Sequence, residues 1–474
     1  MGAIKFGTDG WRAVISEDFT FDNVKIVAQS VADYVKEALP TLKVKDEKVV
    51  VGYDTRFLSD KYAELVACVL AANGIKVILS DRSAPTPSVS FAIKDRGLIG
   101  GIMITASHNP ARYNGIKYKA FYAGSADPSI TKKLEANLGK NEIKFEPLES
   151  LKTKGMVTVE DIIPRHLDFV KKYVNLSLLK KARFKILVDS MYGTGKGYIG
   201  ELLKGGKCKV DIIHNEVNPS FGGINPEPIL PNLKELADKV KKGKYDIGIA
   251  TDGDADRLGI ALPNGKLLTG HKVMTLLLLH LLEDKKMKGD VVQTICGTVL
   301  INKICKKYGL KMHETPVGFK YICDIMRKED VIVGGEETGG VAFKHYIPER
   351  DGILSGLLIL EMMAMRKKKI MDILKAIDKE YGTYEYRRLD AKYADDKKPR
   401  LMEFLKNTPP NRVLDKKIVQ IKDTDGYKFI CEDESWMMLR LSGTEPILRI
   451  YAEASNEKKA LAILEFAKNI AYSI

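Results

Sequence analysis

Short apolar runs alternate with amphipathic stretches along most of this chain, and the alternation repeats three times. The runs at 48–56, 184–195 and 289–299 are rich in β-branched residues and end in a polar turn. Each is followed by an amphipathic stretch that stops at a glycine and by a second short run, which is typical of strand, helix and strand. A further helical stretch and a last apolar strand complete each copy. This order predicts three similar α/β domains with largely parallel sheets.

The densest polar clusters come directly after the last strand of each copy. They are TASHNP at 105–110, TDGDADR at 251–257 and EETGG at 336–340. Parallel sheets place their ligand-binding loops at the carboxyl ends of the strands. We therefore expect the three domains each to offer one loop to a shared cleft.

The last part of the chain has a different pattern. Residues 384–400 are mostly polar and are predicted to form a linker. Strand-like runs at 417–423, 426–432, 435–442 and 447–454 follow, and then a closing helix from Lys458. This pattern predicts a small α+β domain with an antiparallel sheet. The polar loop RLSGTEPILR at 440–449 interrupts two of its strands.

Composition narrows the class of partner. The 474 residues carry a formal charge of +14, which favours anionic partners. The basic residues do not gather in one arm, and no zinc finger, RNP or homeodomain pattern occurs. We therefore expect small phosphorylated substrates and no nucleic acid.

Apolar and cysteine patterns indicate where the protein works. The opening MGAIKFGTDGWR has no apolar run, so we expect no secretory signal. The aliphatic stretch 273–282 is shorter than the roughly 20 residues that span a bilayer, so it predicts a buried helix and no membrane. Six cysteines without C-x-x-C spacing predict reduced thiols, no zinc site and a cytoplasmic location.

Three alternating aspartates, Asp252, Asp254 and Asp256, suggest a metal site in the second loop. Their mutual repulsion would be relieved by a hard divalent cation. An EF-hand is excluded because its sixth position is Arg257 and its twelfth is Pro263. Magnesium fits better because it needs few protein ligands, and Arg257 indicates a nearby anion. A solvated turn is the alternative.

Ser107 is the candidate nucleophile of the first loop. A serine hydroxyl needs activation. His108 adjoins it in sequence, and Lys117 could fold back to it across a loop that contains Pro110. A phosphoryl group on Ser107 would give the magnesium ion an anionic ligand and Lys117 a partner. The alternative is that Ser107 caps a helix N-terminus.

The remaining two loops offer binding groups. Glu336 and Thr338, between glycines, suit sugar hydroxyls, with a flexible acidic loop as the alternative. Lys320, just upstream, could reach an anion, with a surface lysine as the alternative. In the final loop, hydroxyls, a glycine and guanidiniums form a candidate phosphate cradle, or else a β-turn with satisfied arginines. Its members are Arg440, Ser442, Gly443, Thr444 and Arg449.

Together with the opening FGTDGWR, these four loops in this order resemble the α-D-phosphohexomutases over essentially the whole chain. The resemblance implies a four-domain α/β architecture, with three similar mixed α/β domains and a smaller C-terminal α+β domain around one cleft. The implied segments are 1–150 with the phosphoserine loop, 151–268 with the metal-binding loop, 269–385 with the sugar-binding loop and 386–474 with the phosphate-binding loop.

The resemblance also implies site roles. Ser107 would carry a phosphoryl group, and Mg²⁺ would be held by that group and the three aspartates. Arg12 and Lys117 would lie beside the phosphate, with Lys117 or His108 as general acid and base. Glu336 and Thr338 would contact sugar hydroxyls, and the final loop would hold the substrate's own phosphate.

The implied reaction interconverts hexose 1-phosphate and hexose 6-phosphate through a hexose 1,6-bisphosphate, with glucose 1,6-bisphosphate as activator, in a monomer or homodimer. Glu337 resembles glucose-preferring members, whereas Thr338 and Leu441 replace the usual serine and proline. We expect glucose phosphates as substrates. Mannose or glucosamine specificity, a sugar-phosphate phosphatase and a non-catalytic sensor remain alternatives.

Overall fold

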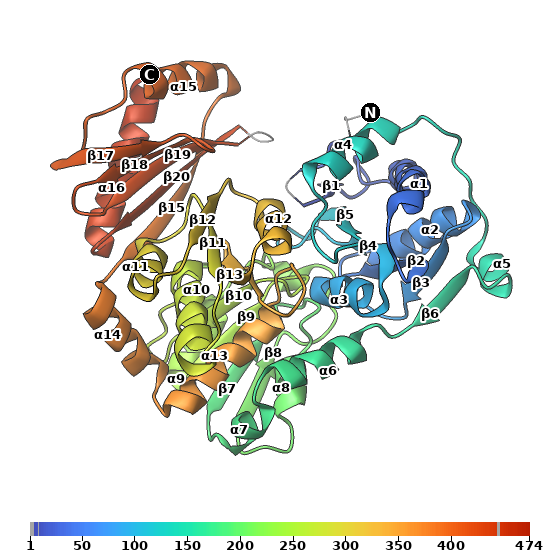
Figure 1. Ribbon diagram of the computed structural model, residues 1–474, viewed down its shortest axis with the longest axis horizontal. Coiled ribbons are helices and arrows are strands. Elements are labelled where there is room, and N and C mark those ends of the chain that lie inside the picture. The colour runs from blue at the N-terminus through green and yellow to red at the C-terminus, as the bar shows by residue number, and fades with distance from the viewer. Residues whose placement is uncertain (1–3, 8, 443–445) are drawn as a thin grey trace. The chain divides into compact units, whose positions relative to one another are not determined.

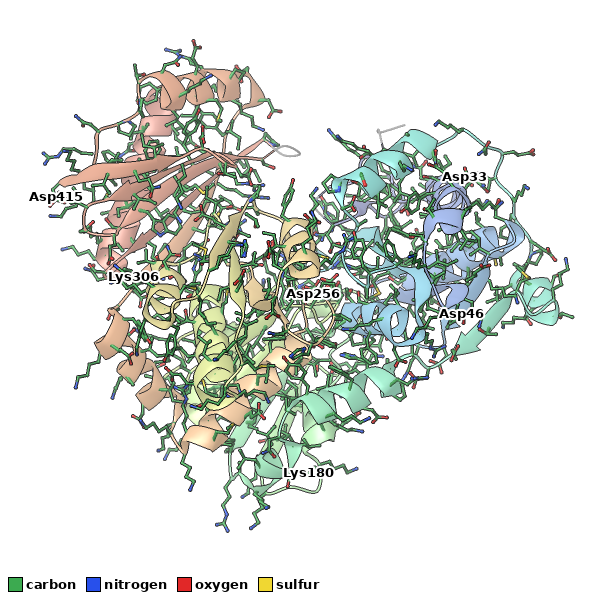
Figure 2. The ribbon with its side chains drawn as sticks, viewed as in Figure 1. Asp33, Asp46, Lys180, Asp256, Lys306 and Asp415 are labelled. Atoms are coloured by element: carbon green, nitrogen blue, oxygen red, sulfur yellow. The ribbon has the colours of Figure 1, made fainter. Side chains whose placement is uncertain are left out.

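The computed structural model describes residues 4–7, 9–442 and 446–474. They divide into two compact units, one formed by residues up to 288 and 318–370, the other by 289–317 and 371–474 (Figure 1). Charged side chains such as Lys306 and Asp415 are exposed, whereas Asp256 is fully buried (Figure 2).

The first sheet of unit 1 has six strands in the order β1-β5-β4-β2-β3-β6. β2, β3, β4 and β6 run parallel. At one edge, β5 pairs antiparallel with β4, and β1 pairs antiparallel with β5. Apolar residues of β2 and β4 are buried because helices pack against this sheet, as parallel strands require. The elements are β1 (Trp11–Val14), α1 (Phe21–Ala38), η1 (Leu39–Thr41), β2 (Asp46–Tyr53), α2 (Ser59–Ala72), β3 (Lys76–Ser80), α3 (Thr86–Arg96), β4 (Leu98–Ile104), β5 (Tyr113–Ala120), α4 (Pro128–Asn137), α5 (Leu148–Thr153) and β6 (Val157–Glu160).

The second sheet of unit 1 has the order β10-β9-β7-β8. β7 pairs in parallel with β8 and β9, and β10 returns antiparallel to β9. The loop between β9 and β10 therefore leaves the carboxyl end of a parallel strand, where the sequence predicts a binding loop. The elements are α6 (Ile163–Tyr173), α7 (Leu176–Lys181), β7 (Lys185–Asp189), α8 (Tyr198–Leu203), β8 (Lys209–Ile213), η2 (Phe221–Gly223), α9 (Lys234–Gly243), β9 (Ile247–Thr251) and β10 (Leu258–Ala261).

The remainder of unit 1 carries the third loop. Strands β13 and β14 pair antiparallel on either side of it. The aliphatic stretch 273–282 is a buried helix with a terminal π turn, as predicted. The elements are α10 (Gly270–Leu279), η3 (His280–Asp284), α12 (Phe319–Lys328), β13 (Val331–Gly335), β14 (Val341–Phe343) and α13 (Gly352–Arg366).

Unit 2 combines a parallel strand pair, β11 and β12, with a six-stranded antiparallel sheet in the order β15-β20-β19-β18-β17-β16. Leu439, Ile450 and Ile463 belong to the core between that sheet and α16. The elements are β11 (Asp290–Thr294), α11 (Val299–Tyr308), β12 (Met312–Thr315), α14 (Ile370–Tyr381), β15 (Glu385–Lys392), η4 (Asp395–Lys397), α15 (Lys398–Asn407), β16 (Arg412–Val413), β17 (Lys416–Lys422), β18 (Tyr427–Cys431), β19 (Trp436–Leu441), β20 (Ile447–Ala454) and α16 (Glu457–Ser473).

The predicted linker at 384–400 is wrong. Its first half is β15, which pairs with β20 from Glu385 opposite Ala454 to Lys392 opposite Ile447. β15 is an edge strand, and most of its side chains are at least partly exposed. Its sequence is therefore polar, although each of its residues pairs with β20.

The predicted fold class is confirmed. Mixed α/β sheets form the first three domains, and an antiparallel sheet forms the last. Among the residues that the structure describes, no helix has both the length and the apolar character that a membrane span requires.

Candidate active site

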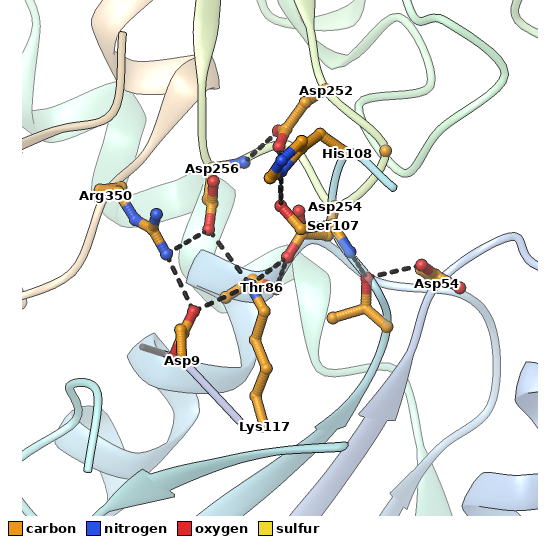
Figure 3. Close-up of polar contacts among 12 residues, drawn as sticks. Asp9, Asp54, Thr86, Ser107, His108, Lys117, Asp252, Asp254, Asp256 and Arg350 are labelled. Carbon is orange, nitrogen blue, oxygen red and sulfur yellow. Dashed lines mark hydrogen bonds and ion pairs between the residues drawn. The ribbon is translucent and has the colours of Figure 1, made fainter. Parts of the chain in front are cut away.

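The serine loop connects β4 to β5 (Figure 3). Ser107 is buried and has a positive φ of 54°, a conformation that is uncommon for residues other than glycine and often marks functional sites. Its amide donates to Thr105 Oγ1 at 2.8 Å, and its Oγ donates to Asp252 Oδ2 at 3.1 Å. A strand follows the loop rather than a helix, so the alternative of a helix cap is wrong.

The three aspartates converge because the loop after β9 curls tightly. Ala255 has φ 58°, and Asp252 Oδ1 accepts the amides of Asp256 and Arg257 at 2.9 and 3.0 Å. One carboxylate oxygen from each aspartate lies within 4.8 Å of the others. Asp254 and Asp256 each keep a buried Oδ1 without a hydrogen-bond partner, as a site for a hard cation requires.

The loop that carries the three aspartates approaches the serine loop so closely that only glycine fits at position 253. A Cβ there would lie 2.5 Å from the carbonyl oxygen of Ser107. The backbone contact explains why the aspartate run begins Asp-Gly-Asp.

Lys117, on β5, does reach the loop of the three aspartates from the far side of the serine loop. Its Nζ lies 2.8 Å from Asp254, 3.0 Å from Asp9 and 3.4 Å from Asp256. Burial alone would lower the pKa of Lys117, but these carboxylates outweigh it and raise the pKa above its usual value. The ammonium is therefore charged at neutral pH.

The aspartates themselves have divergent acidities. Burial, with repulsion from the neighbouring carboxylates, raises the pKa of Asp252 well above its usual value and also raises that of Asp256. Burial would raise the pKa of Asp254 too, but Lys117 and a hydrogen bond from Thr86 at 2.6 Å hold it below its usual range. A divalent cation would stabilise the ionised carboxylates of Asp252 and Asp256 and so lower their pKa values.

The other residues predicted for this end of the site are His108, Arg12 and Arg257. His108 Nδ1 is 3.4 Å from Ser107 Oγ, and burial together with nearby cations lowers its pKa well below the usual value, so the imidazole is neutral. Arg12 Nη1 donates to Asn109 Oδ1 at 2.7 Å in the serine loop. Arg257 Nε is buried and lies 4.0 Å from carboxylate oxygens of Asp252 and Asp256, beyond hydrogen-bond range.

The third loop lies between β13 and β14. Gly339 has φ 87°, which closes the turn, and Thr338 Oγ1 is buried without a partner. Burial raises the pKa of Glu336 to about 7 although Arg350 Nη1 lies 3.3 Å from its carboxylate. Lys320, in the first turn of α12, is half-buried with its Nζ 5.3 Å from the ring centre of Tyr321.

Arg350 joins these groups and was not among the residues predicted from the sequence. Its Nη2 lies 2.7 Å from Asp256 and 3.0 Å from Asp9, while Nη1 faces Glu336. The signal was the polar cluster PERDG at 348–352, which follows β14. Asp54 and Arg56 were also not predicted. They lie in YDTR, directly after β2, at the edge of the first sheet from which the serine loop leaves β4.

Replacing Glu336 by glutamine is expected to stabilise the protein at pH 8. The folded-state pKa of about 7 lies above the ordinary 4.5, so the folded state binds the proton more tightly and stability is lost as pH rises between these values. The Glu336→Gln variant should gain up to about 3 kcal/mol at pH 8 and less than about 1 kcal/mol at pH 5. Melting temperatures at the two pH values measure this.

The exposed Glu17→Gln variant is the control and should melt like the unmodified protein at both pH values. An equal or lower melting temperature of Glu336→Gln at pH 8 would contradict the expectation.

In unit 2, two arginines of the predicted phosphate loop face each other. Arg440 on β19 and Arg449 on β20 are directly opposite in register. Like charges at such a position are destabilising unless an anion or carboxylate intervenes. Arg440 Nε donates to Asp425 at 2.8 Å, but its Nη1 is buried without a partner. Ser442 is buried, and Gly443 and Thr444 lie outside the described residues.

Four family models match the chain in succession. They describe phosphoglucomutase/phosphomannomutase α/β/α domain I at residues 3–144, domain II at 164–265, domain III at 269–381 and the C-terminal domain at 366–469. A phosphoglucomutase/phosphomannomutase of Thermococcus kodakarensis is 31% identical over 97% of this chain and 96% of its own length. A phosphoglucosamine/phosphogalactosamine mutase of Sulfurisphaera tokodaii is 30% identical over 98% of both chains.

Solved structures agree with this likeness. A crystal structure from Thermus thermophilus, provisionally named a phosphomannomutase, has a TM-score of 0.87 and 33% identity over 99% of both chains. An N-acetylphosphoglucosamine mutase of Aspergillus fumigatus, in complex with GlcNAc-6P and magnesium, shares the fold with a TM-score of 0.61 and 16% identity over 99% of this chain and 95% of its own.

Proposed function

Since the chain belongs to the phosphoglucomutase/phosphomannomutase family and is a phosphohexomutase, we propose that Ser107 is the residue through which it passes the phosphoryl group. The observation that carries this proposal is the contact of a buried, left-handed Ser107 with Asp252, beside two further aspartates and Lys117. The segments 1–150, 151–268, 269–385 and 386–474 would each contribute one loop.

Mg²⁺ is the cation that we propose for the aspartate loop. Asp252, Asp254 and Asp256 would hold it, together with a phosphoryl oxygen on Ser107. When bound, the ion neutralises negative charge on the transferring phosphoryl group. The unpartnered Oδ1 atoms of Asp254 and Asp256 fit this assignment.

The reaction begins with a phosphoryl group on Ser107. Its P–O bond to the serine breaks as the free hydroxyl oxygen of a hexose monophosphate bonds to phosphorus. The hydroxyl proton passes to a base, the neutral His108, and the serine oxygen accepts a proton from an acid, the Lys117 ammonium. The product is a hexose 1,6-bisphosphate, which turns in the site and returns its other phosphoryl group to Ser107. Arg12 and Arg257 would stabilise the anionic groups throughout.

The second half of the site would hold the sugar and its non-transferring phosphate. Glu336 and Thr338 would bind sugar hydroxyls, and the buried Oγ1 of Thr338 is available for such a bond. Arg440, Ser442, Gly443, Thr444 and Arg449 would bind the phosphate, with Lys320 as a further cation. Facing arginines at 440 and 449 support this assignment.

Glucose phosphates are the proposed substrates. The acidic pair Glu336 and Glu337 supports glucose, and the relatives are named phosphoglucomutase/phosphomannomutase and phosphoglucosamine/phosphogalactosamine mutase. One inverted hydroxyl changes binding modestly unless a buried partner is left unpaired. We therefore expect mannose 1-phosphate as a slower second substrate.

The test is a panel of glucose, mannose and glucosamine 1-phosphates with Mg²⁺ and a trace of glucose 1,6-bisphosphate. We expect the highest kcat/KM with glucose 1-phosphate and no turnover by the matched Ser107→Ala variant. A preference for glucosamine 1-phosphate would contradict the glucose assignment. Release of inorganic phosphate in place of isomerisation would indicate a phosphatase.

Mg²⁺ is expected to stabilise the protein through the aspartate loop. At about 100 times its dissociation constant, the ion should add about 3 kcal/mol to the free energy of unfolding. Calorimetric titration should show binding that Asp256→Asn removes and that Asp238→Asn, at a partly exposed position of α9, retains. Unchanged binding by Asp256→Asn would contradict the metal assignment.

A further inference from the structure

Arg56 holds the serine loop by its backbone. The side chain extends from the segment after β2 and is fully buried. Nη2 donates to the carbonyl oxygens of Ser107 and Asn109, both at 2.7 Å. Nη1 donates to those of Pro110 and Tyr113 at 2.9 and 3.0 Å. One guanidinium thus fixes four carbonyl groups between Ser107 and the start of β5.

Asp54 fixes the guanidinium and, through Thr105, the other side of Ser107. It accepts Arg56 Nε at 3.0 Å and the Arg56 amide at 2.9 Å. It also accepts Thr105 Oγ1 at 2.6 Å, and Thr105 Oγ1 in turn accepts the Ser107 amide. Both backbone groups of Ser107 are therefore bound to one connected network.

All five N–H donors of Arg56 have partners in this arrangement, and the ring of Phe221 lies against its guanidinium at 4.9 Å. A lysine has three donors that diverge from one atom and cannot reproduce a planar fork. A neutral side chain would leave the buried Asp54 carboxylate without its counter-ion and several loop carbonyls without partners.

We propose that Arg56 and Asp54 are positioning residues that hold Ser107 in its left-handed conformation, with Oγ toward Asp252. The proposal rests on the function assigned to Ser107 above. Neither residue touches the reacting atoms. Misplacement of a reacting atom by about 1 Å can lower a rate by about 100-fold, so loss of the fork acts on turnover more than on substrate binding.

The experiment compares Arg56→Lys, Arg56→Ala and the control Arg96→Ala in the mutase assay, together with melting temperatures. Arg96, at the end of α3, forms a two-bond ion pair at 2.8 and 2.9 Å with Glu160 of β6, in the same six-stranded sheet as β2. We expect kcat of Arg56→Lys to fall about 100-fold with KM within about threefold, and Arg96→Ala to retain full kcat. Added guanidinium should restore kcat of Arg56→Ala by at least about tenfold, because the freed space admits that ion.

Two results would overturn the proposal. One is wild-type kcat in Arg56→Lys. The other is a loss that follows the melting temperature alone and that guanidinium does not restore, as a merely structural arginine would give. If Arg56→Ala does not fold, the kcat and KM of Arg56→Lys decide whether the positioning role holds. The Ser107→Ala variant separates the two proposals: if it is inactive while Arg56→Lys is fully active, only the positioning role fails.

Discussion

Replacement of Ser107 by alanine is expected to lower mutase turnover by at least about 10,000-fold. In the proposed reaction the hydroxyl is the group that accepts and donates the phosphoryl group, and neither His108 nor Asp252 can replace it as a carrier in the same position. The melting temperature should fall by only a few degrees, because the lost hydrogen bond to Asp252 is worth about 1–3 kcal/mol and its carboxylate keeps two backbone donors.

The measurement combines the coupled assay with mass analysis of the peptide that contains residue 107 after incubation with glucose 1,6-bisphosphate. The unmodified protein should gain one phosphoryl group on that peptide, and Ser107→Ala should gain none. As a matched control, Ser129→Ala removes an exposed serine of α4 and should retain full turnover. Residual turnover above about 1% of the unmodified rate in Ser107→Ala would contradict the carrier role.

Replacement of Lys117 by methionine is expected to lower kcat by about 1,000-fold and to tighten Mg²⁺ binding. The first effect follows because the ammonium no longer stabilises the phosphoryl group or transfers a proton. The second follows because Lys117 now shares Asp254 and Asp256 with the proposed ion and repels it. Turnover and metal affinity should thus move in opposite directions.

Stability should report the same competition. Without metal, Lys117→Met leaves Asp9, Asp254 and Asp256 short of a buried cation and should lose about 3–5 kcal/mol. Saturating Mg²⁺ should recover part of this loss. Lys133→Met, which breaks an exposed ion pair with Glu37, is the control and should change neither property. Weaker Mg²⁺ binding in Lys117→Met would contradict the account.

The sequence was sufficient for features whose signal is local. Strand and helix alternation predicted the sheets, and the close spacing of Asp252, Asp254 and Asp256 predicted that they converge. Arg350 and Arg56 were missed because each is a lone arginine whose importance comes from residues far away in sequence. β15 was missed because an edge strand buries few of its side chains, so it lacks the apolar pattern on which strand prediction depends.

Unit 1 is discontinuous in sequence, since the chain leaves it after Lys288 and returns at Gly318. Arg350 therefore emerges from the ribosome long after Asp9 and Asp256, the carboxylates whose charges it helps to balance. Until Arg350 is synthesised, Asp9 and Asp256 lack one of the cations that offset their burial, and hydration of these carboxylates is favoured. The proposed catalytic centre is therefore completed only late in synthesis, and a nascent chain that ends before Arg350 carries Ser107 and Lys117 without this cation.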